Sequence, residues 1–317
     1  MKAMLIFNPA AGQRTLRHSL IQALLRLELR DWDIDWRETR WPGDATRLAY
    51  QAVEKGYDVV LVAGGDGTIG QVVTGLAGSK TALGILPVGT GNVVARDLGL
   101  PYPNTRRWDV LLPAVDVIIS GNQRRVDVGV VYSPNALRSP THFLAWTGTG
   151  FDAHVTRAVE AHPQLKRRLA WGAFVILALR SLRYFHSARA VITIDGERID
   201  DEILLVVASN IGLYAGLFQI APAARLDDGL LDVYCFHGTG IATMLHHALN
   251  IVLGRQQRHP RVSVRRARHI TIHTDRPFPF QIDGDFGGYT PLTIEILPRA
   301  LTLYLPAQVP RERFTED

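Results

Sequence analysis

The sequence predicts a three-layer α/β domain followed by an antiparallel, β-sandwich-like domain. In the first 100 residues, short apolar strands alternate with segments whose apolar residues recur at helical spacing. From about residue 124 onward, short strand patterns separated by turn residues predominate. Alternating strands and helices are typical of a mostly parallel sheet that helices cover on both faces. A length of 317 residues is enough for two such domains, each with its own core.

The N-terminal elements follow one another in a regular order. Strands are expected at Ala3–Phe7, Trp32–Trp36, Asp58–Ala63 and Ala82–Pro87. Helices are expected at Leu16–Leu29, from Asp44 as N-cap to Val53, after Thr68, and at Val93–Leu98. Ligands of parallel sheets bind beyond the carboxyl ends of the strands, so the turns that follow these strands are candidate binding sites.

The second half reads as a series of strands interrupted by three helices. Val115–Ile119 and Arg125–Val131 flank Gly121-Asn122 and predict a hairpin, and Asp195-Gly196 signals another. Further strands are expected at His142–Trp146, Ala190–Ile194, Ile203–Ala208, Leu230–Phe236, Val262–Ile272 and Leu292–Leu297, and helices at Ala153–Glu160, Lys166–Tyr184 and Ile241–Leu253. We expect domains at residues 1–123 and 124–300, with residues 301–317 as a C-terminal segment that could return to the first domain.

Composition indicates a soluble globular protein, and the charge favours anionic partners, with a merely soluble basic protein as the alternative. Hydrophobic residues make up 47% and charged residues 21%, which is ordinary for a globular chain, and the net charge is +5. Cys235 is the only cysteine, which excludes an intramolecular disulfide and a cysteine metal cage. The apolar run Leu169–Leu179 is too short to span a bilayer, and the N-terminus has no signal-peptide layout. We therefore expect a cytoplasmic protein.

Three glycine- or asparagine-bearing turns follow three of the predicted strands, at Asn8–Gly12, Gly64–Thr68 and Gly89–Asn92. Glycines let the backbone approach a bulky anion, and the first amides of a following helix point at it. Asp66 cannot bind phosphate directly, because two anions repel each other; a cation such as Mg²⁺ between them would explain the carboxylate. The alternative is a glycine-rich turn with a solvated aspartate.

Other common site patterns fit poorly. Gly65–Gly70 matches the dinucleotide fingerprint G-x-G-x-x-G, but Ala82–Val88 supplies no acid about 20 residues further on for the ribose. No Walker lysine motif occurs. His237 and His246-His247 lack metal-ligand spacing with nearby carboxylates. These observations disfavour a dehydrogenase, a P-loop enzyme and a histidine metal centre.

Seven segments occur in a fixed order: Phe7-Asn8-Pro9 with Gly12, Gly64–Thr68, Leu86–Asn92, Asp127–Gly129, Gly148–Ala153, Ile220–Ala224 with Asp227–Asp232, and Gln281–Asp285. In this order they resemble the motifs of the diacylglycerol kinase catalytic family, in its bacterial lipid kinase branch, over nearly the whole chain. The resemblance implies an N-terminal nucleotide-binding domain like that of NAD kinases and 6-phosphofructokinases. It also relates the chain to sphingosine and ceramide kinases.

The resemblance also implies roles for particular residues. The ATP site would be formed by Asn8, Gly64, Gly65, Gly67, Thr68, Gly89, Thr90, Asn92 and Asp285. Asp66 and Asp127 would hold catalytic Mg²⁺, at least partly through water, and Asp283 would be the general base. Asp285 stands where the family usually has glutamate. Asp228 and Leu230 would hold a second, structural Mg²⁺, with a solvated turn as the alternative.

One position departs from the family pattern. The family usually has aspartate after the asparagine of the third turn, where this chain has Val93. One carboxylate of the expected metal network is therefore missing. Asp97, one helical turn further on, could face the same way.

The predicted function is an ATP- and Mg²⁺-dependent lipid kinase, with diacylglycerol as acceptor and phosphatidic acid as product. A sphingoid base or another lipid alcohol is the alternative acceptor. A catalytically weak nucleotide- or lipid-binding regulator and a soluble-metabolite kinase are the other classes. The Gly148–Ala153 and Asp227–Asp232 segments of the full-length second domain disfavour the soluble-metabolite kinase.

The predicted partners are ATP, the lipid and an anionic membrane surface, bound transiently, with no nucleic acid; a homodimer is left open. Apolar residues within Lys166–Tyr184, flanked by Arg167, Arg168, Arg180 and Arg183, suit such a surface, and core packing is the alternative.

Overall fold

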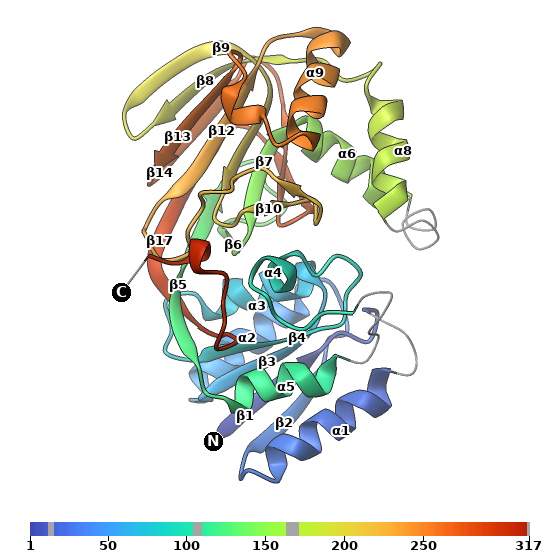
Figure 1. The fold of residues 1–317 in the computed structure, drawn as a ribbon, viewed down its shortest axis with the longest axis vertical. Coiled ribbons are helices and arrows are strands. Elements are labelled where there is room, and N and C mark those ends of the chain that lie inside the picture. Colours follow the sequence, from blue (N-terminus) through green and yellow to red (C-terminus); the bar gives the residue numbers. More distant parts are fainter. Residues whose placement is uncertain (12–15, 104–109, 163–170, 316–317) are drawn as a thin grey trace. The chain divides into compact units, whose positions relative to one another are not determined.

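The computed structural model describes residues 1–11, 16–103, 110–162 and 171–315, and these form two compact units (Figure 1). The first unit comprises Met1–Val128, Arg225–Asp228 and Pro298–Asp317, and the second comprises Gly129–Ala224 and Gly229–Leu297. Strands β5 (Gln123–Tyr132) and β17 (Leu292–Tyr304) run from one unit into the other. The limits expected for the folding domains, 1–123, 124–300 and 301–317, stay a prediction.

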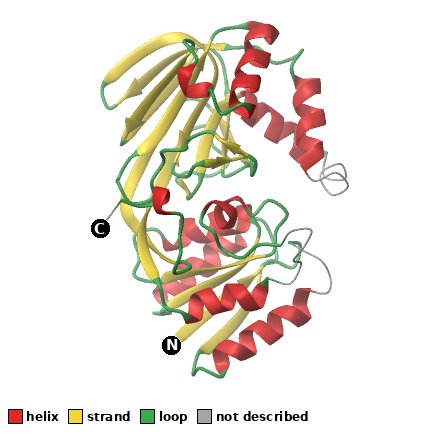
Figure 2. Cartoon of the chain, viewed as in Figure 1, coloured by secondary structure: helices red, strands yellow, loops and turns green. Residues whose placement is uncertain are grey.

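The first unit is built on four parallel strands in the order β4-β3-β1-β2. Its elements are β1 (Lys2–Phe7), α1 (Leu16–Glu28), β2 (Asp33–Glu38), α2 (Asp44–Glu54), β3 (Val59–Gly64), α3 (Asp66–Leu76), β4 (Ala82–Pro87), α4 (Val93–Asp97), α5 (Leu111–Ile119) and the 3₁₀ helix η2 (Arg311–Arg313). Ala3, Leu5 and Phe7 share a core with α1 and α5, while α2 and α3 pack together separately from that core. Figure 2 shows helices on both sides of these strands, which confirms the predicted three-layer α/β fold.

Two local predictions in this unit were wrong. Val115–Ile119 is not a hairpin strand; it belongs to helix α5, whose buried residues Leu111, Ala114, Val115 and Ile118 recur at helical spacing. Asp44 is not the N-cap of α2, because Gly43 occupies that position and Asp44 is the first helical residue. The buried Asp44 carboxylate instead accepts the amide of Arg40 and pairs with Arg47.

The second unit is an antiparallel, β-sandwich-like assembly, as predicted. Its strands are β6 (Thr141–Phe143), β7 (Trp146–Gly150), β8 (Ala188–Ile194), β9 (Glu197–Ser209), β10 (Leu213–Tyr214), β11 (Phe218–Gln219), β12 (Leu231–His237), β13 (Val262–Ala267), β14 (His269–Thr274), β15 (Pro279–Ile282) and β16 (Asp285–Tyr289). Its helices are α6 (Phe151–Glu160), α8 (Trp171–Ser181), α9 (Gly240–Val252) and η1 (Gln256–Arg258). The core draws alternate residues from these strands, such as Ile192, Ile270 and Ile294. Among the described residues, no helix combines the length and the hydropathy needed to cross a membrane.

Two predicted strands are each divided in two, for the same physical reason. His142–Trp146 becomes β6 and β7, and the backbone amides at the break bind the carboxylate of Asp283. Val262–Ile272 becomes β13 and β14, and the amides of Arg268 and His269 at that break bind the carboxylate of Asp195. A distant aspartate thus satisfies amides that the sheet leaves unpaired.

Candidate active site

The three predicted turns lie at one edge of the first unit's sheet, because β1, β3 and β4 are parallel neighbours. Phe7 is paired with Ala63, and Gly64 with Pro87, so the strands end at nearly the same level. The first two turns are joined by their side chains, since Asn8 Nδ2 donates to Thr68 Oγ1 at 2.9 Å. Asn8 also donates its backbone N–H to the carbonyl of Ala63 at 3.0 Å.

The second and third turns touch backbone to backbone. A Cβ added to Gly89 would lie 2.5 Å from the Cα of Gly65, and one added to Gly64 would lie 2.6 Å from the Cβ of Thr68. A side chain at Gly89 would therefore push the two turns apart, and one at Gly64 would collide with Thr68 inside the second turn. Gly65 and Gly89 thus allow the two turns to touch at the edge of the sheet.

Asp66 links the second turn to the third. Its Oδ1 accepts the amide N–H of Val93 at 2.7 Å and that of Val94 at 3.4 Å. Its Oδ2 lies against Gly91, where an added Cβ would come within 2.8 Å of it. Burial raises the pKa of the Asp66 carboxyl above its ordinary value, and the amide hydrogen bonds oppose that shift. The backbone of Gly91 leaves space beside Oδ2 that a side chain would fill.

Asn92 and Thr90 play different parts in the third turn. Asn92 is buried with φ 46°, and its side-chain amide closes the turn by bonding both the N–H and the carbonyl of Gly89. Thr90 is exposed at the tip of the turn, so its side chain is the more accessible of the two. In the structure, Asn92 therefore serves to close the turn.

Val93 and Asp97 do not supply the carboxylate that the family pattern leads one to expect. Val93 is only 7% exposed, so its side chain faces the interior. The Asp97 side chain is 1% exposed, and its Oδ2 lies 2.8 Å from Nε of Arg313, which is itself buried. Asp97 is thus paired with residues 305–315, which we call the C-terminal arm, rather than presented at the edge of the sheet.

Two further carboxylates of the first unit, those of Asp127 and Asp227, accept hydrogen bonds. Asp127 is fully buried, and its Oδ1 accepts the amide of Arg299 at 2.7 Å, which disfavours direct contact with a metal. Asp227 accepts both the amide and the hydroxyl of Thr315, at 2.7 and 2.8 Å. In the described part of the chain, no three acidic, histidine or cysteine side chains gather as a metal-binding group, and this includes the neighbourhood of Asp228 and Leu230.

Asp283 lies in the second unit, at the tip of the β15–β16 hairpin. It and Gly284 have φ of 49° and 85°, which suits a two-residue hairpin turn. Its carboxylate accepts three successive backbone amides, those of Leu144, Ala145 and Trp146, at 3.0–3.1 Å. Such charge-assisted hydrogen bonds stabilise the ionised form and fix its orientation. Asp285, the first residue of β16, is exposed next to this turn.

Asp152 belongs to the Gly148–Ala153 motif, but the sequence did not predict that it lies in a buried polar network. Its Oδ2 accepts the hydroxyl of Tyr214 and the side-chain amide of Gln281, each at 3.0 Å. Gln281 Oε1 in turn accepts the amide of Gly284 beside Asp283. Burial raises the pKa of Asp152 to about 6, although these donors oppose the shift. A Cβ at Gly148 would collide with Asp152, so the glycine and the aspartate of this motif require each other.

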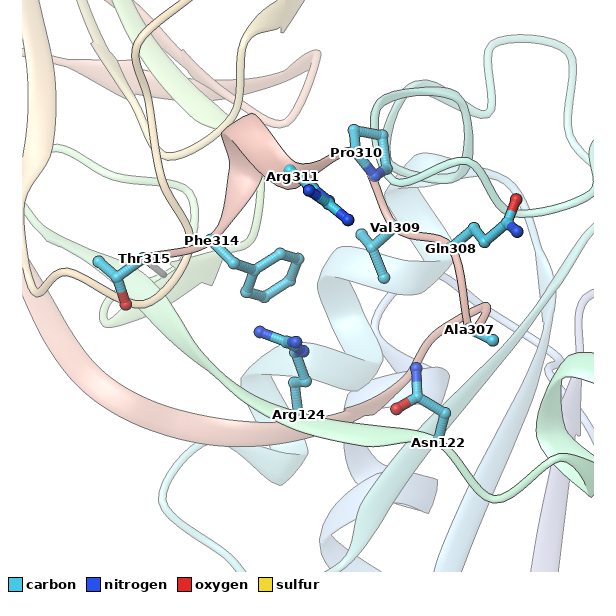
Figure 3. Close-up of a pocket in the computed structure, with 9 residues that line it drawn as sticks. All are labelled: Asn122, Arg124, Ala307, Gln308, Val309, Pro310, Arg311, Phe314 and Thr315. Carbon is cyan, nitrogen blue, oxygen red and sulfur yellow. The ribbon is translucent and has the colours of Figure 1, made fainter. Parts of the chain in front are cut away.

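A cavity of about 670 Å³ also occurs in the first unit, beside the C-terminal arm (Figure 3). Asn122, Arg124, Arg311 and Phe314 are among its lining residues, and the Arg124 guanidinium lies 4.9 Å from the centre of the Phe314 ring. None of the predicted site residues lines it, so it is separate from the three turns. Gly12 of the first motif and Lys166–Leu169, with Arg167 and Arg168, lie outside the described residues.

Comparison with known proteins agrees with the motifs. Residues 2–131 match the model of the diacylglycerol kinase catalytic domain, and residues 145–305 match that of the YegS C-terminal NAD kinase beta sandwich-like domain. A protein named diacylglycerol kinase from Staphylococcus carnosus (strain TM300) is 29% identical over 97% of this chain and 96% of its own length. One of the same name from Bacillus subtilis (strain 168) is 28% identical over 97% of each chain.

A crystal structure of a diacylglycerol kinase from Bacillus anthracis str. Sterne superposes with a TM-score of 0.70 at 26% identity, covering 96% of this chain and 97% of that one. The two matched domain models together span the three glycine- and asparagine-bearing turns and the Asp283 hairpin. The chain belongs to the diacylglycerol kinase catalytic-domain family, in its bacterial lipid kinase branch.

Proposed function

We propose that this protein is an ATP- and Mg²⁺-dependent kinase that transfers the γ-phosphate of ATP to the hydroxyl of diacylglycerol, giving phosphatidic acid. The observation that carries the proposal is the junction of the Gly64–Thr68 and Gly89–Asn92 turns, with Asp66 between them. Backbone amides and glycines at the carboxyl ends of parallel strands suit a polyphosphate. The family and its relatives named diacylglycerol kinase support the choice of a lipid acceptor.

Asp66 is the residue of the first unit that fits a Mg²⁺ ligand. Magnesium usually takes one or two protein carboxylates and completes its shell with phosphate oxygens and water, so a cluster of three acids is not required. The space beside Asp66 Oδ2, kept open by Gly91, suits such a ligand. When bound, the ion would spread the charge of the phosphates. Asn8, Thr68 and Thr90 would orient the nucleotide, while the buried Asp127 would act by fixing the backbone near Arg299.

Asp283 is proposed as the general base for the acceptor hydroxyl. In transfer, the acceptor oxygen bonds to the γ-phosphorus as the bond to ADP breaks, and the hydroxyl proton passes to Oδ2 of Asp283. The three amides that hold its carboxylate keep it oriented before transfer. Asp285 would then contribute charge near the bound nucleotide. Asp228 and Leu230 as holders of a structural Mg²⁺ remain a proposal that a metal-binding measurement can test.

A catalytically weak nucleotide- or lipid-binding protein is the second candidate. It is favoured by Val93, which replaces a carboxylate, and by Asp97, which is committed to Arg313. A sphingoid base or another lipid alcohol is the alternative acceptor for the kinase. We further propose a cytoplasmic protein that contacts anionic membranes transiently; the exposed Arg180, in the last turn of α8, and Arg183, just after the helix, would contribute to that contact.

The test uses labelled ATP with a panel of acceptors: diacylglycerol, a sphingoid base and soluble alcohols. We expect transfer to diacylglycerol that requires Mg²⁺. Asp283→Asn should lower turnover by roughly 10²–10⁴-fold and leave ATP binding intact, because it removes the proton acceptor and no nucleotide contact. Asparagine tolerates the positive φ of this position, so the turn should survive, and a thermal melt checks this.

The control is Asp195→Asn, since Asp195 also has positive φ at a hairpin turn and also binds amides at a strand break. We expect this variant to retain turnover. No transfer to any acceptor by the wild-type protein would favour the second candidate. Near-normal turnover of Asp283→Asn would show that another group accepts the proton.

A further inference from the structure

Helix α9 of the second unit exposes a continuous apolar face. Ile241, Leu245, Leu249 and Val252 are 45–60% exposed, and Leu253, which follows the helix, is 52% exposed. At about 100° per residue, the first four project within an arc of about 80° along a helix about 20 Å long. We call these four residues the α9 stripe. On a solvent-facing helix this side would ordinarily be polar.

The buried side of α9 is narrow by comparison. Met244 and His247 are its only buried side chains, and Met244 joins a small core cluster that includes Phe185 and Phe278. The His247 imidazole donates from Nε2 to the carbonyl of His237 at 2.9 Å, which fixes the helix to β12. The helix is thus attached by one edge, and the α9 stripe is not the face that attaches it.

Helix α8 adds apolar surface in the same unit. Val175, Ile176 and Leu179 are 36–62% exposed. Leu182, just after α8, packs against the same small cluster as Met244 of α9. Figure 1 draws α6, α8 and α9 on one side of the strands of this unit. The exposed apolar side chains of two neighbouring helices therefore belong to one helical layer.

The chain around α9 is strongly basic. Residues 233–274 contain six arginines and no aspartate or glutamate. Arg255, Arg258 and Arg261 directly follow the helix and are exposed. None of the ion pairs among the described residues involves these three arginines, whereas Arg265 pairs with Glu197. An apolar stripe that ends in cations without acidic partners is complementary to an anionic, apolar-centred surface.

We propose that the α9 stripe is the surface by which this protein docks on an anionic lipid bilayer, with Arg255, Arg258 and Arg261 at the lipid phosphates. This docking rests on the proposed function, since it brings the enzyme to a substrate dissolved in the membrane. The four side chains present roughly 400 Å², a patch of the size that marks interaction sites on monomers. A stable protein interface buries about 800 Å² per partner, roughly twice the area of this patch. The α9 stripe is a different docking site from the one predicted at the arginines of Lys166–Tyr184.

The decisive variant is Leu245→Gln/Leu249→Gln, which keeps helix propensity and removes two stripe residues. The matched control is Ile21→Gln/Leu25→Gln, an equally spaced pair on α1 of the first unit that is 46% and 51% exposed. Binding to vesicles of phosphatidylcholine with or without phosphatidylglycerol is measured by sedimentation without ATP. Kinase turnover on detergent-dispersed acceptor and the oligomeric state by gel filtration are measured in parallel.

We expect wild type and the α1 control to bind phosphatidylglycerol vesicles equally, and the stripe variant to bind at least about tenfold more weakly. Turnover on dispersed acceptor should be the same in all three. Arg258→Gln/Arg261→Gln should weaken binding only to the anionic vesicles. Equal vesicle binding by the stripe variant and the control would overturn the proposal, as would a wild-type dimer that the stripe variant alone dissociates. Because vesicle binding is measured without ATP, absence of kinase activity would count against the proposed function and leave this test unaffected.

Discussion

Removing the guanidinium of Arg313 should destabilise the first unit severely. Arg313 lies in the C-terminal arm, and its Nε is 2.8 Å from Oδ2 of Asp97, the last residue of α4. The two side chains are 4% and 1% exposed, so Arg313→Met removes the ion-pair contribution of Arg313 from a carboxylate in the interior. Breaking one side of a buried ion pair typically costs 3–5 kcal/mol. For a unit of this size, each kcal/mol of lost stability lowers the melting temperature by about 2–4 °C. The expected loss therefore lowers it by roughly 10 °C.

The assay is urea and thermal unfolding of wild type, Arg313→Met, Asp97→Leu/Arg313→Met and Arg17→Met. The double variant should recover most of the lost stability, because replacing both members of a buried pair by apolar residues is close to neutral. Arg17→Met is the control: its partner Glu38 is on the surface and its own side chain is 65% exposed, so a change of about 0–1 kcal/mol is expected. A loss below about 1 kcal/mol for Arg313→Met, or no recovery in the double variant, would refute the reasoning.

Three further predictions concern the site and its surroundings. Val93→Asp should lower the melting temperature and leave the Mg²⁺ dependence of turnover unchanged, because the side chain faces the interior; a shifted Mg²⁺ curve would contradict this. Gly91→Ala should weaken Mg²⁺-ATP binding in calorimetry at least tenfold, since its Cβ would meet Asp66 Oδ2 at 2.8 Å; unchanged affinity would exclude that oxygen from the metal site. Burial lowers the pKa of His247 below 6.5, so its contribution to stability is present above pH 6.5 and is lost as pH falls further. His247→Gln should therefore flatten the fall in melting temperature between pH 7 and 5, and an unaltered slope would assign it to other groups.

The sequence alone was sufficient for the order of elements wherever apolar periodicity matched one type of structure. The parallel strands of the first unit and the helices between them were predictable because each strand is a short apolar run that ends in a turn residue. Where periodicity was ambiguous, prediction failed. The β-branched run of Val115–Ile119 forms a helix because the buried face it presents to α1 has helical spacing, which becomes evident only when Leu111 and Ala114 are included.

The motif residues were also predictable, because their order along the chain resembles that of a known family. What each residue does depends on its contacts in the folded chain. Asn92 proves to close its own turn, and the conformational demands on Gly89 come from Gly65, which is far away in the sequence. Only the tertiary structure shows that these turns touch.

The sequence by itself determined the family, the two kinds of fold and the short list of carboxylates on which catalysis could depend. Only the tertiary structure decided which donors each buried carboxylate of the chain binds. Asp97 pairs with Arg313, Asp127 holds the amide of Arg299, and Asp227 binds Thr315, in each case across a long stretch of chain. The physical reason is that a buried carboxylate must find donors, and the donors that satisfy it are chosen by packing rather than by sequence neighbours.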